Sequence, residues 1–304
     1  MWSASLNNSG TRSRWSNKVD WATTSSFIPL VGLSLEVCVS QDVVSELQAT
    51  CEAAARAGGK ELLGWRGRFS THVKGLRDFV TDADFASQKA IQQVIQSRFP
   101  EHRFVGEEQS PRTGRPALDE ISWIVDPLDG TTNYVHGYPH YAVSVAVARG
   151  AKILAGVIFD PLHDECYSAA AGLGAFCNDI PLKVSAARAI AEALVAVSLP
   201  AQVDRNTPDL LDFIEVVLSC QAVRRSGSAA LNLAHVASGS LDAFWAAHIH
   251  PWDVAAGVLL IREAGGHVTG RHGGEFNVWH PHFVAAANPS LHGELLAILH
   301  KFSA

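Results

Sequence analysis

The sequence predicts an α/β protein in which layers of helix and strand alternate. Apolar residues recur with a helical period in several segments, and short apolar runs of strand length lie between them. Glycines and prolines separate most of these segments. Hydrophobic residues make up 47% and charged residues 18% of the 304 residues, as in a globular protein with a substantial core.

The first half of the chain is expected to contain two helices and then mostly strands. A helix is predicted over residues 41–64, with an apolar stripe that includes Val44, Leu47 and Cys51. A second helix follows Thr81 or Asp82, either of which can cap it, and ends before Pro100. Strands are predicted at 122–125, at 141–149 paired with 152–159, and within 165–184.

The second half alternates between the two kinds of element. Strands are predicted near 193–198, 221–225, 241–246 and 282–287. Helices are predicted near 208–219, from about Ser228, at 252–264 and at 289–302. A strand-rich first half and an alternating second half indicate two lobes, at about 38–187 and 188–304, within one domain.

Residues 1–37 differ in composition from the rest. They are rich in Ser, Thr and Asn, and Asp20 and Glu36 are their only acids. We expect a disordered tail, with an organelle-targeting segment as the alternative. We otherwise expect a cytoplasmic protein, because the five cysteines are scattered without a C-x-x-C motif and no apolar run approaches the ~20 residues of a membrane helix.

The charge balance bears on partners. The formal net charge is −6 and the pI is about 6.1, which argues against a broad basic surface for nucleic-acid binding. An acidic protein that handles an anionic substrate needs local positive charge, and bound cations can supply it.

Carboxylates stand beside small or turn-forming residues in four short segments. These segments are Thr81–Asp84, Gly106–Glu108, Asp126–Asn133 and Trp252–Asp253. Most acidic residues are solvated surface groups. Asp126, however, directly follows the apolar run 123–125, so it lies at the end of an expected buried strand, where α/β proteins place ligands.

Residues 126–132 combine groups that suit a cation with groups that suit an anion. Pro127 fixes its own φ and Gly130 permits a sharp turn. Asp126 and Asp129 can then point to one place with the Leu128 carbonyl between them, and oxygen ligands of this kind suit Mg²⁺. The backbone N–H groups of residues 130–132 can bind a phosphate.

This pattern resembles the signature of the inositol monophosphatase family, which belongs to the lithium-sensitive, metal-dependent phosphatases together with the fructose-1,6-bisphosphatases. The matching residues are Asp84, Glu107-Glu108, Asp126–Thr131, Trp252-Asp253 and Gly265-Gly266. Their order and spacing agree over roughly residues 41–304. The resemblance implies an alternating αβαβα sandwich, a homodimer, and a catalytic domain that hydrolyses a small sugar, polyol or alcohol monophosphate.

The resemblance also implies two or three Mg²⁺ ions. Their ligands would be Glu107, Asp126, the Leu128 carbonyl, Asp129, Asp253 and Asp84. The first ion would take Glu107, Asp126 and Leu128, and Asp126 would bridge it to a second ion on Asp129 and Asp253. Asp84, with Glu107, would serve a weaker third ion or its water.

For catalysis, the resemblance implies that a metal-activated water attacks phosphorus directly and that no phosphoenzyme forms. Thr131, Glu107 and Asp84 would orient and activate this water. Substrate contacts would come from Asp129, Gly130, Thr131, Gly227, Ser228, Ala229 and Asp253. Residues 227–229 resemble the loop at the edge of the family's substrate site.

One departure from the family pattern concerns the substrate. Inositol-specific members usually carry a glutamate seven residues before the aspartate of Trp-Asp, and Ala246 stands there in this chain. Loss of a hydroxyl-binding partner weakens discrimination for that hydroxyl. The candidate substrates therefore include inositol phosphates, histidinol phosphate, other polyol phosphates and fructose-1,6-bisphosphate.

Three other interpretations remain open at this point. Asp82-Ala83-Asp84 could be the D-x-D of an aspartate-nucleophile phosphatase, and the pairs His248/His250 and His280/His282 could bind zinc. The chain could also be a regulatory protein that keeps the phosphatase fold and acts through partners. The intact acidic set favours the metal-dependent phosphatase.

Overall fold

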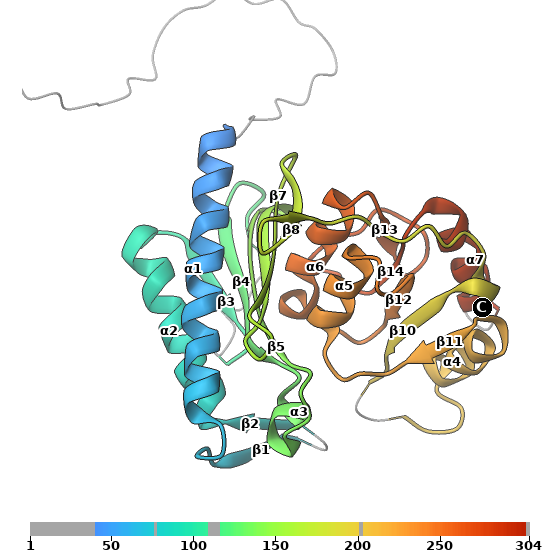
Figure 1. Cartoon of the computed structure of the whole chain (residues 1–304), viewed down its shortest axis with the longest axis horizontal. Helices are drawn as coiled ribbons and strands as arrows, with labels where there is room; N and C mark the ends of the chain where they lie inside the picture. The colour runs from blue at the N-terminus through green and yellow to red at the C-terminus, as the bar shows by residue number, and fades with distance from the viewer. Residues whose placement is uncertain (1–39, 76–77, 109–115, 201–202, 302–304) are drawn as a thin grey trace, which may run out of the picture. The chain divides into compact units, whose positions relative to one another are not determined.

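The computed structural model describes residues 40–75, 78–108, 116–200 and 203–301, and within them helices and sheets alternate in layers (Figure 1). Helices α1 (Gln41–Trp65) and α2 (Asp82–Arg98) cover one face of a seven-stranded sheet. Helices α5 (Ala229–Ala237) and α6 (Pro251–Glu263) lie between this sheet and a five-stranded one. Helices α4 (Pro208–Ser219) and α7 (Pro289–Leu299) cover the outer face of the second sheet. The predicted α/β layered fold, an αβαβα sandwich, is confirmed.

The seven-stranded sheet has the order β3-β4-β5-β6-β7-β8-β9. Its strands are β3 (Arg103–Gly106), β4 (Ile121–Asp129), β5 (Ala142–Arg149), β6 (Lys152–Asp160), β7 (Glu165–Ala170), β8 (Gly174–Cys177) and β9 (Ile180–Pro181). Only β3 and β4 are parallel; the other neighbours are antiparallel. Residues of β4, β5 and β6 are almost all buried because helices cover both faces of the sheet.

The five-stranded sheet has the order β11-β10-β12-β14-β13. Its strands are β10 (Leu194–Ser198), β11 (Ala222–Arg224), β12 (Ala243–Ala246), β13 (His267–Gly270) and β14 (Phe283–Ala286). The central strand β12 is fully buried. A separate hairpin, β1 (Thr71–Gly75) with β2 (Asp78–Thr81), precedes α2, and two short helices, α3 (Thr131–His136) and the 3₁₀ turn η1 (Ile190–Glu192), complete the described elements.

Local sequence explains where the helices begin and how deeply they lie. The Ser40 side chain accepts a hydrogen bond from Val43 N–H at the start of α1. Thr81 and Asp84 form a reciprocal capping box at the start of α2. Helix α6 is buried on every side over Val254–Ile261, as expected for a helix that lies between two sheets.

Close packing of α5 against α6 depends on Gly257. A Cβ at this position would overlap the Cβ of Leu233. We expect Gly257→Ala to lower the free energy of unfolding by about 1–3 kcal/mol, because overpacking outweighs the better helix propensity of alanine. Urea unfolding monitored by circular dichroism measures this change.

Gly293 in α7 is the matched control, since a Cβ there has no neighbour within 4 Å. Gly293→Ala should raise the free energy of unfolding by about 0.5–1 kcal/mol. If Gly257→Ala unfolds at the same urea concentration as the wild type, the proposed close packing between α5 and α6 is wrong.

The predicted helices and strands are confirmed, and six short elements were missed: strands β1, β2, β3 and β13, helix α3 and the 3₁₀ turn η1. The strand expected at 122–125 instead continues as β4 to Asp129. The predicted tail over 1–37 lies outside the described residues, and the boundary between two lobes near residue 187 stays a prediction.

Cys51, Cys166, Cys177 and Cys220 are free thiols. No described helix is both long and apolar enough to cross a membrane.

Candidate active site

Three aspartates from distant parts of the chain meet at one place. One carboxylate oxygen from each of Asp126, Asp129 and Asp253 lies within 4.8 Å of the other two. Asp126 and Asp129 are buried in the last part of β4, and Asp253 lies half-buried in the first turn of α6. Within the described residues this is the only group of His, Cys, Asp or Glu side chains with the spacing of metal ligands.

An irregularity in β4 turns two of these aspartates to the same side. Pairing with β5 is regular up to Asp126 and shifts register between Asp126 and Asp129. Leu128 N–H donates to Asp126 Oδ1 at 3.0 Å, and Ser87 Oγ donates to the Pro127 carbonyl at 2.8 Å. In a regular strand, residues two apart share a face and residues three apart lie on opposite faces. Asp126 and Asp129 are three apart, so the shift in register is what lets them face the same side.

The N-termini of α5 and α6 hold one oxygen each of Asp129 and Asp253. Asp129 Oδ2 accepts hydrogen bonds from the Ser228 hydroxyl and from Ala230 N–H at 2.7 Å, at the start of α5. Asp253 Oδ2 accepts from His250 N–H at 2.8 Å. These contacts fix the orientation of both carboxylates, since each one has an oxygen engaged by a helix N-terminus.

Negative charge is concentrated at this site. Burial and the nearby charges of Glu107, Asp129 and Asp253 raise the pKa of Asp126 well above its usual value. Burial raises the pKa of Asp129 to about 6, although hydrogen bonds from Ser228 and Ala230 oppose the shift. Burial and the charge of Asp129 raise the pKa of Asp253. Such mutual repulsion is what a bound cation would relieve.

Glu107 belongs to this charge cluster. It follows β3, and its N–H donates to the Val125 carbonyl at 3.2 Å, which places it beside the end of β4. Its charge acts on Asp126, Asp129 and Asp253. The N–H of the neighbouring Glu108 donates to Gln88 Oε1 at 3.0 Å.

Asp84 and Thr131 lie close to each other beside the Leu128 carbonyl. Thr131 Oγ1 is 3.3 Å from Asp84 Oδ1 and 3.1 Å from the Leu128 carbonyl. Asp84 Oδ2 accepts hydrogen bonds from Thr81 N–H at 2.8 Å and from Thr81 Oγ1 at 2.6 Å. The capping box of α2 therefore also holds a carboxylate against the hydroxyl of Thr131.

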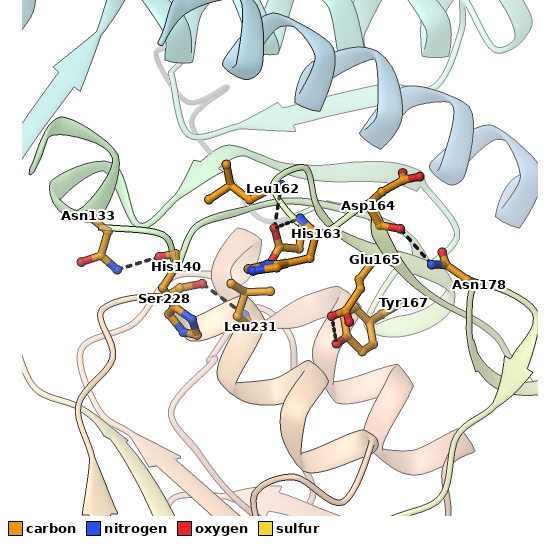
Figure 2. Close-up of polar contacts among 11 residues, drawn as sticks. Asn133, His140, Leu162, His163, Asp164, Glu165, Tyr167, Asn178, Ser228 and Leu231 are labelled. Carbon is orange, nitrogen blue, oxygen red and sulfur yellow. Dashed lines mark hydrogen bonds and ion pairs between the residues drawn. The ribbon is translucent and has the colours of Figure 1, made fainter. Parts of the chain in front are cut away.

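The turn after β4 starts α3. Gly130 has φ +95°, a conformation that favours glycine, and a Cβ there would lie 3.1 Å from the His140 carbonyl. Asn133 Nδ2 donates to the His140 carbonyl at 2.7 Å and to the Ser226 carbonyl at 2.9 Å. Asn133 thus connects the turn to the segment that precedes α5; Figure 2 shows it beside His140, with Ser228 nearby.

A cleft of about 720 Å³ opens beside these groups. Its lining includes Asp129, Asn133, Gly227, Ala229, His248 and Asp253. Ser228 directs its hydroxyl to Asp129 instead and is fully buried.

The structure thus brings the sequence-predicted site residues to one region. Their individual roles stay predictions. Asn133 and Ser87 have no role in the sequence-based predictions, although both hold the turn in place. Asn133 lies within the acidic segment that follows the strand, which was a usable signal, whereas Ser87 offered none.

Two open interpretations lose support from the geometry. Asp82 and Asp84 lie in the first turn of α2, where Asp84 serves the cap and Asp82 Oδ2 accepts from Ser70 N–H at 2.8 Å, rather than at the end of a buried strand. No described histidines form a group with metal-ligand spacing.

Comparisons with known proteins agree on one family. The family model described as "Inositol monophosphatase family" matches residues 42–304. The chain is 38% identical to inositol monophosphatase 3 of Solanum lycopersicum over 259 residues, which is 84% of this chain and 96% of the relative. It is 37% identical to Nus factor SuhB of Pasteurella multocida over 253 residues, covering 82% and 94%.

A solved structure of an IMPase/NADP phosphatase complexed with Mg²⁺ and phosphate is also similar. It has a TM-score of 0.71 and 27% identity, and the match covers 80% of this chain and 90% of that one. Because the family model spans nearly all the described residues and the acidic signature converges in space, the chain belongs to the inositol monophosphatase family.

Proposed function

We propose that this chain, a phosphoric monoester hydrolase by family, removes phosphate from a small sugar, polyol or alcohol monophosphate in the presence of Mg²⁺. The observation that carries the proposal is the convergence of Asp126, Asp129 and Asp253 beside the turn at Gly130. Cation ligands and phosphate donors then lie side by side in space.

The donor set fits Mg²⁺. All of the converging ligand atoms are oxygens, and the pKa values of Asp126 and Asp129 are raised by burial first and by neighbouring negative charge second. We assign one ion to Glu107, Asp126 and the Leu128 carbonyl. We assign a second to Asp126, Asp129 and Asp253. Asp84, with Glu107, serves a weaker third. The similar IMPase/NADP phosphatase complexed with Mg²⁺ and phosphate supports this choice of ion.

When bound, the cations lower the pKa of water and stabilise the negative charge of the leaving oxygen. The chain's own residues position the reactants. Thr131 Oγ1, held between Asp84 Oδ1 and the Leu128 carbonyl, orients the attacking water. Glu107 accepts one proton from this water, and Asp84 holds the Thr131 hydroxyl in place.

The turn after β4 holds the phosphate. Helix α3 begins at Thr131, and the first N–H groups of a helix have no partner within that helix. Gly130, Thr131 and Thr132 therefore direct donors to the phosphate oxygens. Gly227, Ala229 and Asp253 line the cleft where the alcohol part of the substrate lies.

The alcohol is not restricted to inositol. Ala246 is fully buried in β12 and supplies no acceptor for a sugar hydroxyl. Substrates to compare are inositol-1-phosphate, histidinol phosphate, fructose-1,6-bisphosphate and an adenosine bisphosphate. We expect Mg²⁺-dependent phosphate release from at least one of them, abolished by EDTA and inhibited by lithium. Absence of release from all four would contradict the proposal.

Magnesium should stabilise the fold more strongly as pH rises. Asp129 has an unfolded pKa near 3.8 and a folded pKa of about 6 without cations, so between these values the cation-free fold holds extra protons that Mg²⁺ must displace. The increase in Tm on adding Mg²⁺ should therefore grow between about pH 4 and pH 7.

The quantity to measure is the difference between Tm in MgCl₂ and Tm in EDTA at each pH. Buried His140 and His292, whose pKa values are lowered to about 4, affect both conditions alike and cancel. A difference that is constant or shrinks as pH rises would contradict a cation site built on Asp129.

A second candidate is a regulatory role, which the similarity to a Nus factor favours. A pull-down of partners with wild-type and Asp126→Asn chains would separate it from catalysis, because partner binding through another surface would survive the substitution.

We also propose that the chain is cytoplasmic and forms a homodimer. Analytical sedimentation would test the dimer.

A further inference from the structure

The side chain of Asn133 connects two walls of the cleft. Asn133 lies in α3, shortly after the turn at Gly130, and it is half-buried. Its Nδ2 donates to the carbonyls of His140 at 2.7 Å and of Ser226 at 2.9 Å. The second acceptor is 93 residues away in the sequence. One amide group therefore holds a segment from each half of the chain.

Residues 225–228, which connect β11 to α5, depend on this contact. Within the described residues, the backbone of Ser226 and Gly227 forms one hydrogen bond, in which the Ser226 carbonyl accepts from Asn133. The Ser226 hydroxyl donates instead to Asn232 Oδ1 at 2.6 Å, in the helix that follows the loop. The Asn133 amide is thus the contact that fixes the backbone of this loop relative to the opposite wall of the cleft.

Gly227 packs against the same amide. A Cβ at this position would lie 2.9 Å from both Nδ2 and Oδ1 of Asn133, closer than a carbon atom can approach them without displacing the amide. Gly227 and Asn133 both line the cleft. The glycine therefore allows the loop to approach the amide closely at a place that a substrate can reach.

The turn after β4 has other supports. Ser87 Oγ donates to the Pro127 carbonyl at 2.8 Å, and Tyr134 N–H donates to the Gly130 carbonyl at 3.0 Å. Neither bond involves the amide of Asn133. Loss of this amide should therefore release the 225–228 loop and leave the turn in place.

We propose that Asn133 is a positioning residue for the alcohol part of the substrate: its amide holds the 225–228 loop beside the phosphate-binding turn before the ester binds. This inference rests on the proposed function, which assigns the phosphate to the turn and the alcohol to the cleft at Gly227 and Ala229. A loop that is already ordered loses little conformational freedom when it contacts a ligand, so the ester binds more tightly. The amide of Asn133 has no part in the chemical step.

The test compares an ester with inorganic phosphate, which occupies the turn without reaching the loop. The ester is the one of the four substrates named above that the wild type hydrolyses with the highest kcat/KM. In Asn133→Ala, we expect KM for this ester to rise by about tenfold, near the upper end of the effect of one hydrogen bond, while kcat stays within about threefold. The inhibition constant of inorganic phosphate should also stay within about threefold, as for a substitution away from its site.

Asn288→Ala is the matched control. Asn288 Nδ2 also donates to a distant carbonyl, that of Ala187 at 2.7 Å, but Asn288 precedes α7 and does not line the cleft. Its side chain also caps α7, so the variant shows whether lost stability alone raises KM. We expect the wild-type KM. Thermal unfolding of both variants verifies that they are folded.

A second substitution tests the contact between the loop and the amide. Gly227→Ala should raise KM in the wild-type chain, because the added methyl group displaces the amide. In the Asn133→Ala chain no amide remains to be displaced, so the same substitution should raise KM by a smaller factor. A methyl group that only obstructed the substrate would raise KM by the same factor in both chains, which would contradict the proposed contact.

The outcomes separate the two proposals. An unchanged KM in folded Asn133→Ala would overturn the positioning role while leaving the phosphatase in place. A fall in kcat, or a rise in the inhibition constant of phosphate, as large as the rise in KM would also overturn it, because the amide would then serve the turn and not the loop. If the wild type hydrolyses none of the four esters in Mg²⁺, the proposed function fails and this inference fails with it.

Discussion

Asp126→Asn should lower kcat by on the order of a thousandfold or more. Asp126 is the carboxylate assigned to both cations, and an amide lacks the charge that holds them. The fold should survive, because the substitution removes one charge from a group of mutually repelling buried acids and keeps an oxygen to accept from Leu128 N–H. Phosphate release at saturating Mg²⁺ and calorimetry of Mg²⁺ binding provide the two measurements.

Asp160→Asn is a suitable control for this change. Asp160 is also buried and also ends a strand of the same sheet, but it accepts from Leu162 N–H and lies outside the acidic group. Its variant should retain kcat within about threefold, as expected for a residue without a partner in the reaction. Near-normal turnover of Asp126→Asn would rule out a bridging role.

Glu107→Gln should lower kcat by roughly a hundredfold or more, since Glu107 is assigned both a cation and the proton of the attacking water. The adjacent residue offers a closely matched control. Glu108→Gln alters the same kind of side chain one position later, at a residue to which neither a cation nor a proton is assigned. It should stay within about threefold of the wild type.

The dependence on Mg²⁺ distinguishes a cation ligand from a residue that only shapes the loop. Glu107→Gln should require more Mg²⁺ for half-maximal activity, whereas Glu108→Gln should not. If the two variants lose activity equally, the assignment of Glu107 rather than Glu108 to the site is wrong.

Much of the fold was predictable because long periodic segments carry strong signals. Helix α1 has a buried stripe through Val44, Leu47 and Cys51. Helix α6 begins at Pro251, and proline is common in the first turn of a helix. The missed elements are short. β3 has four residues and pairs in parallel with β4, the next strand along the chain, and no local sequence pattern indicates this pairing. α3 spans six residues and depends on Gly130 for its start.

The candidate site was predictable in composition and only partly in geometry. Carboxylates next to turn residues indicated the ligands, and the resemblance to a family grouped them. The sequence could not indicate that Ser228 directs its hydroxyl to Asp129, because the two residues are 99 positions apart and meet only where the start of α5 reaches the end of β4. Nor could it indicate that β4 continues past Pro127, where the absent N–H is accommodated by the shift in register.

The backbone contacts of the three aspartates have a consequence for ion selectivity. Asp126, Asp129 and Asp253 each have one oxygen engaged by a backbone N–H, from Leu128, Ala230 and His250 respectively. Each carboxylate is therefore expected to bind an ion through its remaining oxygen alone, not through both oxygens. Calcium, a larger ion, takes six to eight oxygen ligands and often both oxygens of one carboxylate, whereas magnesium takes six ligands in a compact octahedron. We therefore expect the proposed site to favour magnesium over calcium through hydrogen bonds that never touch the ion.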